Sequence, residues 1–491
     1  MRKIKTLFIL SFLAIVTLTT ACSEKPIEAT VSDDVLTAPS KSTSTEPSSP
    51  TTNALGNTFN PKPFPSNTIL GIPGFQFPEA AITIDNWVAA NPMNTDSIYL
   101  HGWGIWAGLN YETTEMFEGQ LLRVFETWYT PQDILCITGI DTSDCPIGQA
   151  LRKPNPVGVL NQNLKLNHRG VGDVVGFVKY DPTAANHIIE QQLLNKMVLT
   201  EMLKDGENSI PAFPNTAISI KPVFAGTAAA TPNGPIISTD GTSALLAIYP
   251  GSQLSCDDPA TGKCFPKNPN HKGYGPMEWP KCVWIDTTNS SSAALSAPVP
   301  CSSNSSTTAY NISEFVHFQD TAGGEYSVLV GMHTTTREIH RWAWQSFFWT
   351  PTPDNPPDPS SKDIANARPK QIVGAAANYA MAIGYSMVSP AQPVTGGKAQ
   401  GESIYAFNPY LEAGFPTLKL AVTGSYTYEG VVVPNRVGVE SNCMSCHALA
   451  TLSGKNDYTG DQYIDLQDPA YFENELSLDF LWSIEQHATN N

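Results

Sequence analysis

Two cysteines and a histidine near the end of the chain are the side chains best suited to chemistry. They stand as Cys443-Met444-Ser445-Cys446-His447, so the thiols are three positions apart and the imidazole follows directly. C-x-x-C-H is the attachment signature of c-type haem. The two thiols add across the two vinyl groups on one porphyrin edge, and the histidine binds the iron from the proximal side. The spacing therefore predicts one covalent haem c, held by Cys443, Cys446 and the iron ligand His447.

Two other uses of this motif stay open. A structural zinc ion takes four Cys or His ligands, commonly as two paired sets, and the sequence has no second C-x-x-C. A disulfide or a redox-active pair needs only Cys443 and Cys446. However, the preceding residues 435–442 do not resemble a buried strand that leads into a helix. Haem attachment is the favoured interpretation.

The second axial ligand of the iron is harder to assign. No methionine follows His447, so this ligand must be His487 or a residue from upstream. His333 lies in a predicted β-hairpin, where cross-strand packing holds a side chain more firmly than a position near the chain end. We therefore expect His333 on the distal face, as ligand or near neighbour. A bis-histidine pair would lower the redox potential relative to His/Met ligation. The next candidates are Met381, Met387 and His101.

The N-terminus resembles the signal of a bacterial lipoprotein. Basic residues precede an apolar stretch, residues 7–18, that is too short to span a bilayer. Ala21 directly precedes Cys22, as in a lipobox, whose cysteine is lipidated and becomes the mature N-terminus. This resemblance predicts a signal peptide over residues 1–21, with an ordinary signal peptide as the alternative. Ser23 in place of aspartate favours the outer membrane, facing the periplasm or the cell surface.

The mature chain divides into three predicted parts. Residues 22–58 are rich in Ser, Thr and Pro and cannot bury enough apolar surface to offset their ordering entropy, so we expect a flexible tether. A β-rich body follows over residues 59–367, and a haem-bearing region over residues 368–491. The proline-rich stretch 350–363 is the predicted boundary between the last two parts.

The charge of the chain limits its partners. The formal net charge is −17, and removal of a signal peptide with three basic and no acidic residues makes it more negative. Such a surface repels nucleic acid and anionic headgroups. We therefore expect no nucleic-acid partner, and membrane contact only through the N-terminal lipid. The apolar stretch 372–388 carries several polar residues, which favours a buried helix over a membrane span.

Six cysteines are left after the lipid and haem candidates are set aside. An exported chain reaches an oxidising compartment, so we expect three disulfides rather than a metal site, since none of the six has C-x-x-C spacing. Six cysteines allow 15 connectivities. Proximity favours the pairs Cys136–Cys145, Cys256–Cys264 and Cys282–Cys301.

The expected fold class is α+β: a β-rich body with a few helices and a C-terminal helical or loop segment that bears the haem. This is not the fold of a standard small cytochrome c. Residues 181–206 predict a helix, with Asp181 as N-cap, Pro182 in the first turn and Gly206 after its end. The other expected elements are strands at 217–224, 243–250, 282–286 and 313–320, a hairpin at 325–349 and a helix at 477–487.

Several islands of the sequence resemble large, single-haem, secreted bacterial proteins described as cytochrome c family proteins. The matching feature is a W-x-W-x-(S/T)-F segment, here Trp342 to Phe347, followed by Asn-x-Pro and a C-terminal C-x-x-C-H. Many relatives have Glu-His where this chain has Phe348-Trp349. The resemblance implies haem and export but specifies no reaction. The islands are residues 101–109, 124–130, 330–357, 441–450 and 478–484.

Together these features predict an extracytoplasmic, membrane-tethered c-type cytochrome. Its function would be electron transfer to or from a redox partner protein or a small-molecule donor or acceptor. The alternative is a haem enzyme of the peroxidase or oxidase kind, with an open distal iron site. A third possibility is a binding or structural lipoprotein in which haem mainly stabilises the fold.

Overall fold

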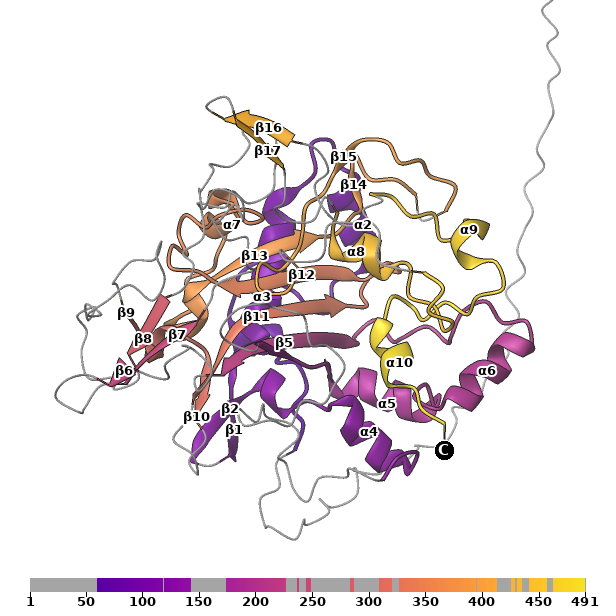
Figure 1. Ribbon diagram of the computed structural model, residues 1–491, viewed down its shortest axis with the longest axis horizontal. Helices are drawn as coiled ribbons and strands as arrows, with labels where there is room; N and C mark the ends of the chain where they lie inside the picture. The colour runs from indigo at the N-terminus through magenta and orange to yellow at the C-terminus, as the bar shows by residue number, and fades with distance from the viewer. Residues whose placement is uncertain are drawn as a thin grey trace, which may run out of the picture. The chain divides into compact units, whose positions relative to one another are not determined.

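An antiparallel sheet of seven strands carries the main elements of the structure, a computed structural model (Figure 1). Its strands are β3 Val174–Gly176, β4 Lys179–Tyr180, β5 Ile218–Gly226, β10 His317–Gln319, β11 Tyr326–Thr336, β12 Ala343–Trp349 and β13 Tyr379–Gly384. The main path runs β13–β12–β11–β5–β3, while β10 also pairs with β11 and β4 also pairs with β5.

The structure describes most of the chain after residue 59. The described ranges are 60–117, 119–142, 174–226, 236–237, 244–248, 283–286, 309–319, 326–393, 395–412, 425–428, 431–434, 441–456 and 462–490. The predicted signal peptide, Cys22 and the tether therefore lie outside them. So do Cys145, Cys256, Cys264, Cys282 and Cys301. Cys136 is disulfide-bonded, but its partner is not described, so all three predicted disulfide pairs stay predictions.

Short helices surround the sheet. The α-helices are α1 Asn67–Leu70, α2 Ala81–Ala89, α3 Thr95–Leu109, α4 Pro131–Thr138, α5 Pro182–Glu190, α6 Lys196–Lys204, α7 Lys362–Asn366, α8 Cys443–His447, α9 Pro469–Phe472 and α10 Trp482–His487. The 3₁₀-helices are η1 Val124–Thr127, η3 Ile312–Glu314 and η4 Gly374–Asn378. Within the described residues, no helix is long and apolar enough to cross a membrane.

Four smaller sheets are also found among the described residues. Three are antiparallel pairs, β1 with β2, β14 with β15 and β16 with β17, and the fourth has the order β6–β7–β8–β9. Their strands are β1 Glu112–Phe117, β2 Gln120–Arg123, β6 Ile236–Ile237, β7 Ala244–Ile248, β8 Val283–Asp286, β9 Ala309–Asn311, β14 Val388–Ser389, β15 Glu402–Ser403, β16 Ser425–Tyr428 and β17 Val431–Pro434. This mixture of helices and open sheets confirms the predicted α+β class.

The hairpin predicted at residues 325–349 is confirmed as β11 and β12. They pair in an antiparallel register in which His333 lies opposite Ser346. On its other side, β11 pairs with β5, and His333 lies opposite Lys221. Since side chains of directly opposed residues project from the same face of a sheet, these three residues share one face. Position 333 therefore lies in the middle of the sheet, between two neighbouring strands.

Helix α3 covers the other face of the sheet. Trp106 stacks on Phe347 of β12 with ring centroids 4.4 Å apart. The glycines of α3 allow this close approach, because a Cβ at Gly102 would lie 2.7 Å from Met381 Sδ of β13. A Cβ at Gly104 would lie 2.0 Å from the Phe75 ring. The glycine-rich island at residues 101–109 is thus explained by helix packing.

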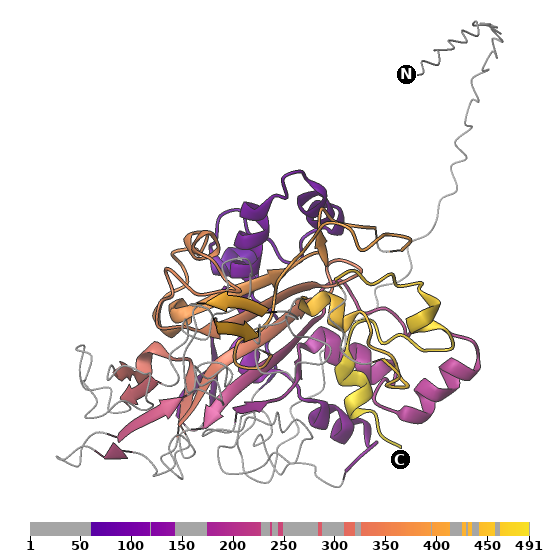
Figure 2. The ribbon, with the colours of Figure 1, turned by 45° about the horizontal axis from the view of Figure 1, so that its top comes forward.

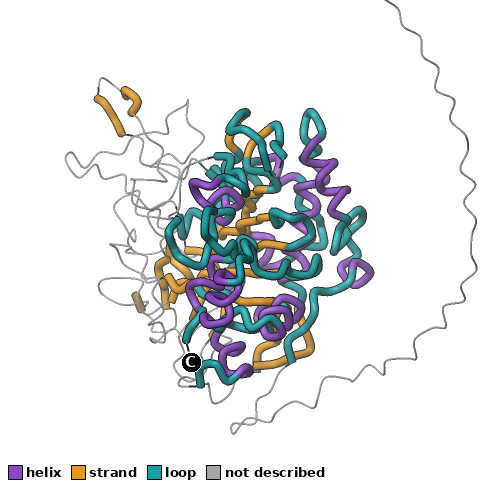
Figure 3. Tube along the Cα trace, turned by 90° about the vertical axis from the view of Figure 1, so that its right-hand side faces the viewer, coloured by secondary structure: helices purple, strands orange, loops and turns teal. Residues whose placement is uncertain are grey.

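The C-terminal helices pack on the face opposite α3. In Figures 1 and 2 the yellow C-terminal helices and helix α3 lie on different sides of the strands, whereas α4 lies on the side of α10. Trp344 of β12 shares an apolar cluster with Cys443 and Leu449, and with Leu481 and Ile484 near the end of the chain. Seen from the side on which α6 and α9 lie in Figure 1, the described chain shows mostly loops and short helices in front of the strands (Figure 3).

The helix predicted at residues 372–388 is wrong. The structure has the short η4 followed by β13, which pairs with β12 over six residue pairs. Tyr379 is fully buried and its hydroxyl donates to Leu329 O at 2.6 Å. Strand pairing and burial on both faces explain the continuous apolar run, which by itself does not distinguish a buried strand from a buried helix.

The helix predicted at residues 181–206 is two helices, α5 and α6. Asp181 caps α5 as expected, and Gly206 has the left-handed φ of 88° expected after the second helix. Between them Gln192 takes a φ of 52°, and Asn195 begins α6 by accepting a bond from Met197 N–H at 3.0 Å. Because Asn195 caps the start of a new helix, the segment with helical periodicity forms two helices rather than one.

Other boundaries also moved. The strands expected near 217–224, 243–250 and 282–286 are found, whereas the one expected at 313–320 begins with η3 and is paired only over β10. The C-terminal helix begins at Trp482, because Asp479 and Phe480 have positive φ values of 46° and 70°.

Residues Pro50–Asn491 form one compact unit. The predicted boundary in the proline-rich stretch falls inside it, between the paired strands β12 and β13.

Candidate functional site

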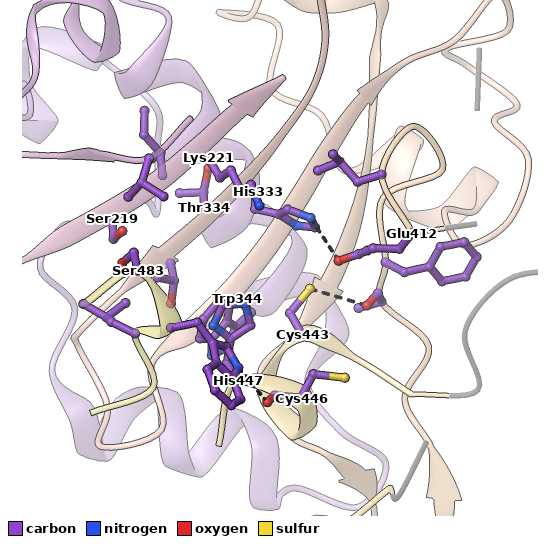
Figure 4. A pocket seen from close by; sticks show the side chains of 18 of the residues that line it. Ser219, Lys221, His333, Thr334, Trp344, Glu412, Cys443, Cys446, His447 and Ser483 are labelled. Atoms are coloured by element: carbon purple, nitrogen blue, oxygen red, sulfur yellow. Dashed lines mark hydrogen bonds and ion pairs between the residues drawn. The ribbon is translucent and has the colours of Figure 1, made fainter. Parts of the chain in front are cut away.

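A pocket lies between the β5–β11–β12 face of the sheet and the helices α8 and α10 (Figure 4). The space in it that the centre of a water molecule can occupy is about 130 Å³. It brings the motif cysteines and His447 together with the strand residue His333. The lining residues used below are Ser219, Lys221, His333, Trp344, Glu412, Cys443, Cys446, His447 and Ser483.

Asn442 begins the helix that carries the C-x-x-C-H motif. Its side-chain oxygen accepts a hydrogen bond from Ser445 N–H at 3.0 Å and so caps α8. Its side-chain amide donates to Met387 O at 2.9 Å and to Ile404 O at 3.0 Å. One residue therefore starts the helical turn and fastens it to the segments around β14 and β15.

The two motif cysteines are thiols in the structure, not a disulfide. Cys443 is buried and donates to Ala406 O at 3.4 Å, while Cys446 is half-buried. Burial raises the pKa of the Cys443 thiol well above its ordinary value, and the Glu412 carboxylate raises it further. A protonated thiol of this kind is a poor redox nucleophile. These surroundings disfavour a thioredoxin-like use of the pair.

The imidazole of His447 is held by its Nδ1 atom. Nδ1 lies 2.8 Å from Phe480 O, so this nitrogen donates its proton to the carbonyl and Nε2 is the lone-pair nitrogen. The Trp344 ring packs on it with centroids 4.2 Å apart. Burial lowers the pKa of His447 to about 4, although the bond to Phe480 opposes this shift. His447 is therefore neutral near pH 7, in the form that binds a metal.

The carbonyl that orients His447 is itself held in place. Asp479 and Phe480 both adopt left-handed backbone conformations, which non-glycine residues rarely take. Arg337 Nε donates to the Asp479 carboxylate at 2.9 Å, and Phe213 N–H donates to the same carboxylate at 3.2 Å. An ion pair from the β11–β12 turn thus stabilises the backbone that positions His447.

His333 enters the same pocket from the sheet. Its Nε2 lies 3.1 Å from Glu412 Oε1, as Figure 4 shows, and Asn408 N–H donates to Glu412 Oε2 at 2.5 Å. Burial by itself raises the pKa of Glu412, but His333 and the Asn408 N–H outweigh it and lower the pKa below its ordinary value. Glu412 is therefore ionised at neutral pH and accepts from His333.

Lys221 adds a cation to this wall. Burial lowers its pKa, and the Glu412 carboxylate opposes that change. Among the described residues Lys221 forms no hydrogen bond or ion pair. Its ammonium group is therefore a charge in the pocket wall without a direct counter-ion in the described part of the protein.

The remaining ligand candidates lie outside the lining of this pocket. Met381 packs against α3 on the opposite face of the sheet. Met387 is buried, and its sulfur accepts from Ile464 N–H at 3.2 Å. His101 is buried between Tyr385 and Glu338, with nitrogen–oxygen distances of 2.5 Å and 3.1 Å. His487 bonds to Ser483 O at 2.8 Å in its own helix.

The donor set fits haem better than zinc. A c-type haem requires two thiols and one neutral imidazole, and Cys443, Cys446 and His447 present these groups to one cavity. Structural zinc requires four protein ligands. Across the described ranges there is no group of three or more His, Cys, Asp or Glu side chains that could hold a metal ion.

Five residues of the site were missed from the sequence: Ser219, Lys221, Asn408, Glu412 and Ser483. Lys221 had a weak signal, because it is a charged residue inside the apolar strand 217–224. Asn408 and Glu412 lie in a loop without periodicity.

Comparison of the chain with protein-family models, with curated proteins and with solved structures finds no match.

Proposed function

We propose that this protein is an exported c-type cytochrome that carries one covalent haem and transfers electrons. Cys443 and Cys446 would hold the haem, and His447 would be its proximal iron ligand. The observation that supports this most strongly is the neutral His447 imidazole, tied through Nδ1 to Phe480 O beside two thiols in one pocket. When bound, haem supplies an iron that takes up and returns single electrons.

The protein's own residues prepare this site. The Phe480 carbonyl holds the proton of His447 at Nδ1 and directs Nε2 away from it. Trp344 packs on the imidazole and limits contact with water. His333 lies in the same pocket, as distal ligand or neighbour. The electron partner would be a redox protein or a small molecule. The protein would be anchored to the membrane through a flexible tether lipidated at Cys22.

Haem staining of a denaturing gel tests the covalent attachment. The wild-type chain should keep the stain at its own mass, and Cys443→Ser with Cys446→Ser should lose it. Met444→Leu is the matched control, because it preserves a buried apolar side chain between the two cysteines. Loss of the stain from the wild type on acid–acetone extraction would contradict the proposal.

A haem enzyme with an open distal iron site is the second candidate. The observation that favours it is the bond between His333 Nε2 and Glu412, since that nitrogen is engaged by a carboxylate. The optical spectrum separates the two functions. A low-spin haem in both oxidation states supports electron transfer. A high-spin ferric haem that binds cyanide readily supports catalysis.

Anchoring by lipid at Cys22 is tested separately. Labelled fatty acid should enter the wild-type protein but not the Cys22→Ser variant. A wild-type protein recovered without lipid in the medium or periplasm would contradict a membrane-tethered location.

A further inference from the structure

One end of the pocket gathers hydrogen-bond donors opposite the motif cysteines. Ser219 and Lys221 are two positions apart on β5 and so project from the same face of the sheet. Ser483 of α10 lines the same cavity. In Figure 4 the two serines lie to the left of His447 and the cysteines to its right, while Lys221 lies beside His333. The cavity therefore has a thiol end and a serine end, and Lys221 is on the sheet wall between them.

Lys221 and the Ser483 hydroxyl are available to a ligand. Lys221 has no hydrogen bond or ion pair among the described residues, because Glu412, the carboxylate near it, accepts from His333 and from Asn408 N–H instead. Ser483 Oγ accepts from Tyr180 OH at 2.7 Å, which leaves its own proton to donate. One ammonium and two hydroxyl groups suit a carboxylate.

Haem itself carries such carboxylates. The vinyl groups that react with cysteine lie on one edge of the porphyrin, and the two propionates lie on the opposite edge. A porphyrin joined to Cys443 and Cys446 would therefore extend its propionates toward the other end of the cavity. We propose that Lys221, with Ser219 and Ser483, is the binding site for a haem propionate.

This inference rests on the proposed function and adds a role for the sheet in it. An anion beside Lys221 would replace the water that the ammonium loses on burial. Burial lowers the pKa of Lys221, and a bound carboxylate would oppose that shift. The pairing would also orient the porphyrin before its thioether bonds form.

Reversible haem binding measures the contribution of Lys221. In the full chain with Cys443→Ala and Cys446→Ala, ferric haem and its dimethyl ester are titrated separately, since the ester lacks the propionate charges. Lys221→Met should weaken haem binding about tenfold, equivalent to one charge-assisted hydrogen bond. The affinity for the ester should not change. Lys221→Arg should keep most of the haem affinity.

Lys196→Met is the matched control, because Lys196 is exposed on α6 and its loss changes the net charge equally. An equal effect of Lys221→Met on haem and on the ester, or no effect on either, would overturn the inference. Azide, a small free anion, is titrated as a further probe. A Lys221→Met variant that loses affinity for azide but not for haem would also overturn the inference, because the site would then bind a free anion rather than a haem propionate.

A second measurement applies if the double cysteine variant does not fold. In the protein with covalent haem, Lys221→Met should lower the midpoint potential relative to wild type and Lys196→Met, because an unpaired propionate favours the ferric state. An unchanged potential would contradict the inference. A wild-type protein without haem on a denaturing gel would instead refute the proposed function, so the two failures are distinguishable.

Discussion

The two faces of the seven-stranded sheet differ in what they contribute. On the α3 face, Trp106 and Phe347 stack in a fully buried apolar cluster. On the C-terminal face, Lys221 and His333 lie opposite each other at the wall of a cavity. Adjacent residues of one strand serve both faces, since Phe347 packs on α3 while its neighbour Ser346 accepts a bond from the Asn408 amide at 3.0 Å. Packing on the α3 face stabilises the sheet. The paired strands in turn hold the polar side chains of the C-terminal face in fixed positions.

The largest test of this comparison removes a tryptophan from the α3 face. Trp106→Ala should lower the free energy of unfolding by about 4 kcal/mol, because a fully buried indole leaves a cavity. It also loses the hydrogen bond from Nε1 to Ala376 O at 2.9 Å. Denaturant unfolding measures the change. If the protein carries haem as proposed, the haem spectrum of the folded variant should stay that of the wild type.

Trp344→Ala is the matched change on the other face. We expect a smaller loss, about 2 kcal/mol, because Trp344 already borders a cavity. The spectrum should change, since the ring packs on His447. A Trp106→Ala variant with an altered spectrum, or a Trp344→Ala variant with an unaltered one, would show that the two faces are not separate in function.

The next test fills the space that α3 needs for close packing. Gly104→Ala should destabilise the protein by about 2–3 kcal/mol, because the new Cβ would lie 2.0 Å from the Phe75 ring. Gly176→Ala on β3 is the control, since its Cβ would meet Lys221 Cε at an ordinary 3.5 Å. Thermal unfolding of both variants gives the answer. Equal melting temperatures would mean that Phe75 moves aside at little cost.

A third test removes the Asp479 carboxylate, which stabilises the backbone next to His447. Asp479→Asn should cost about 2 kcal/mol, because it removes the charge that Arg337 and Phe213 N–H bind at a buried position. It should also shift the redox potential, since the Phe480 carbonyl orients His447. Asp354→Asn is the control, because Asp354 is 87% exposed in its pair with Arg368 and should matter by less than about 1 kcal/mol. Redox titration and denaturant unfolding would be compared, and a potential that stays constant in Asp479→Asn would remove Asp479 from the support of the site.

The last test concerns pH in the haem-free protein with both motif cysteines changed to alanine. The pKa of His447 is about 4 when folded, below its ordinary value of 6.5. The unfolded chain therefore binds a proton between these values that the folded chain does not. Its stability should be complete above about pH 6.5 and fall by about 1–3 kcal/mol as the pH drops toward 4.

Unfolding curves at several pH values measure this dependence. The additional change His447→Gln should remove that part of the slope, because glutamine does not titrate. If the slope is the same with and without His447, the imidazole is solvated in the haem-free protein.

Local features were predicted best. The hairpin at 325–349 was predicted from strand-like runs in which Trp342, Trp344, Ser346 and Phe348 recur at period two. Asp181 with Pro182 marks a helix start through backbone chemistry alone. The apolar stretch 372–388 was assigned wrongly, because pairing with β12 decides between strand and helix. Asn195 splits a predicted helix by capping α6, which the apolar periodicity around it conceals.

The sequence by itself was enough to bring Cys443, Cys446 and His447 together, because a single helical turn spans them. It also indicated His333, because strand pairing makes a histidine there well held. Only the tertiary structure could place His333 in the same cavity as His447, and Glu412 and Lys221 beside it. Lys221, His333 and His447 are each more than a hundred residues apart in the chain, and Glu412 lies 79 residues after His333. No local pattern of residue types records which strands and loops will meet.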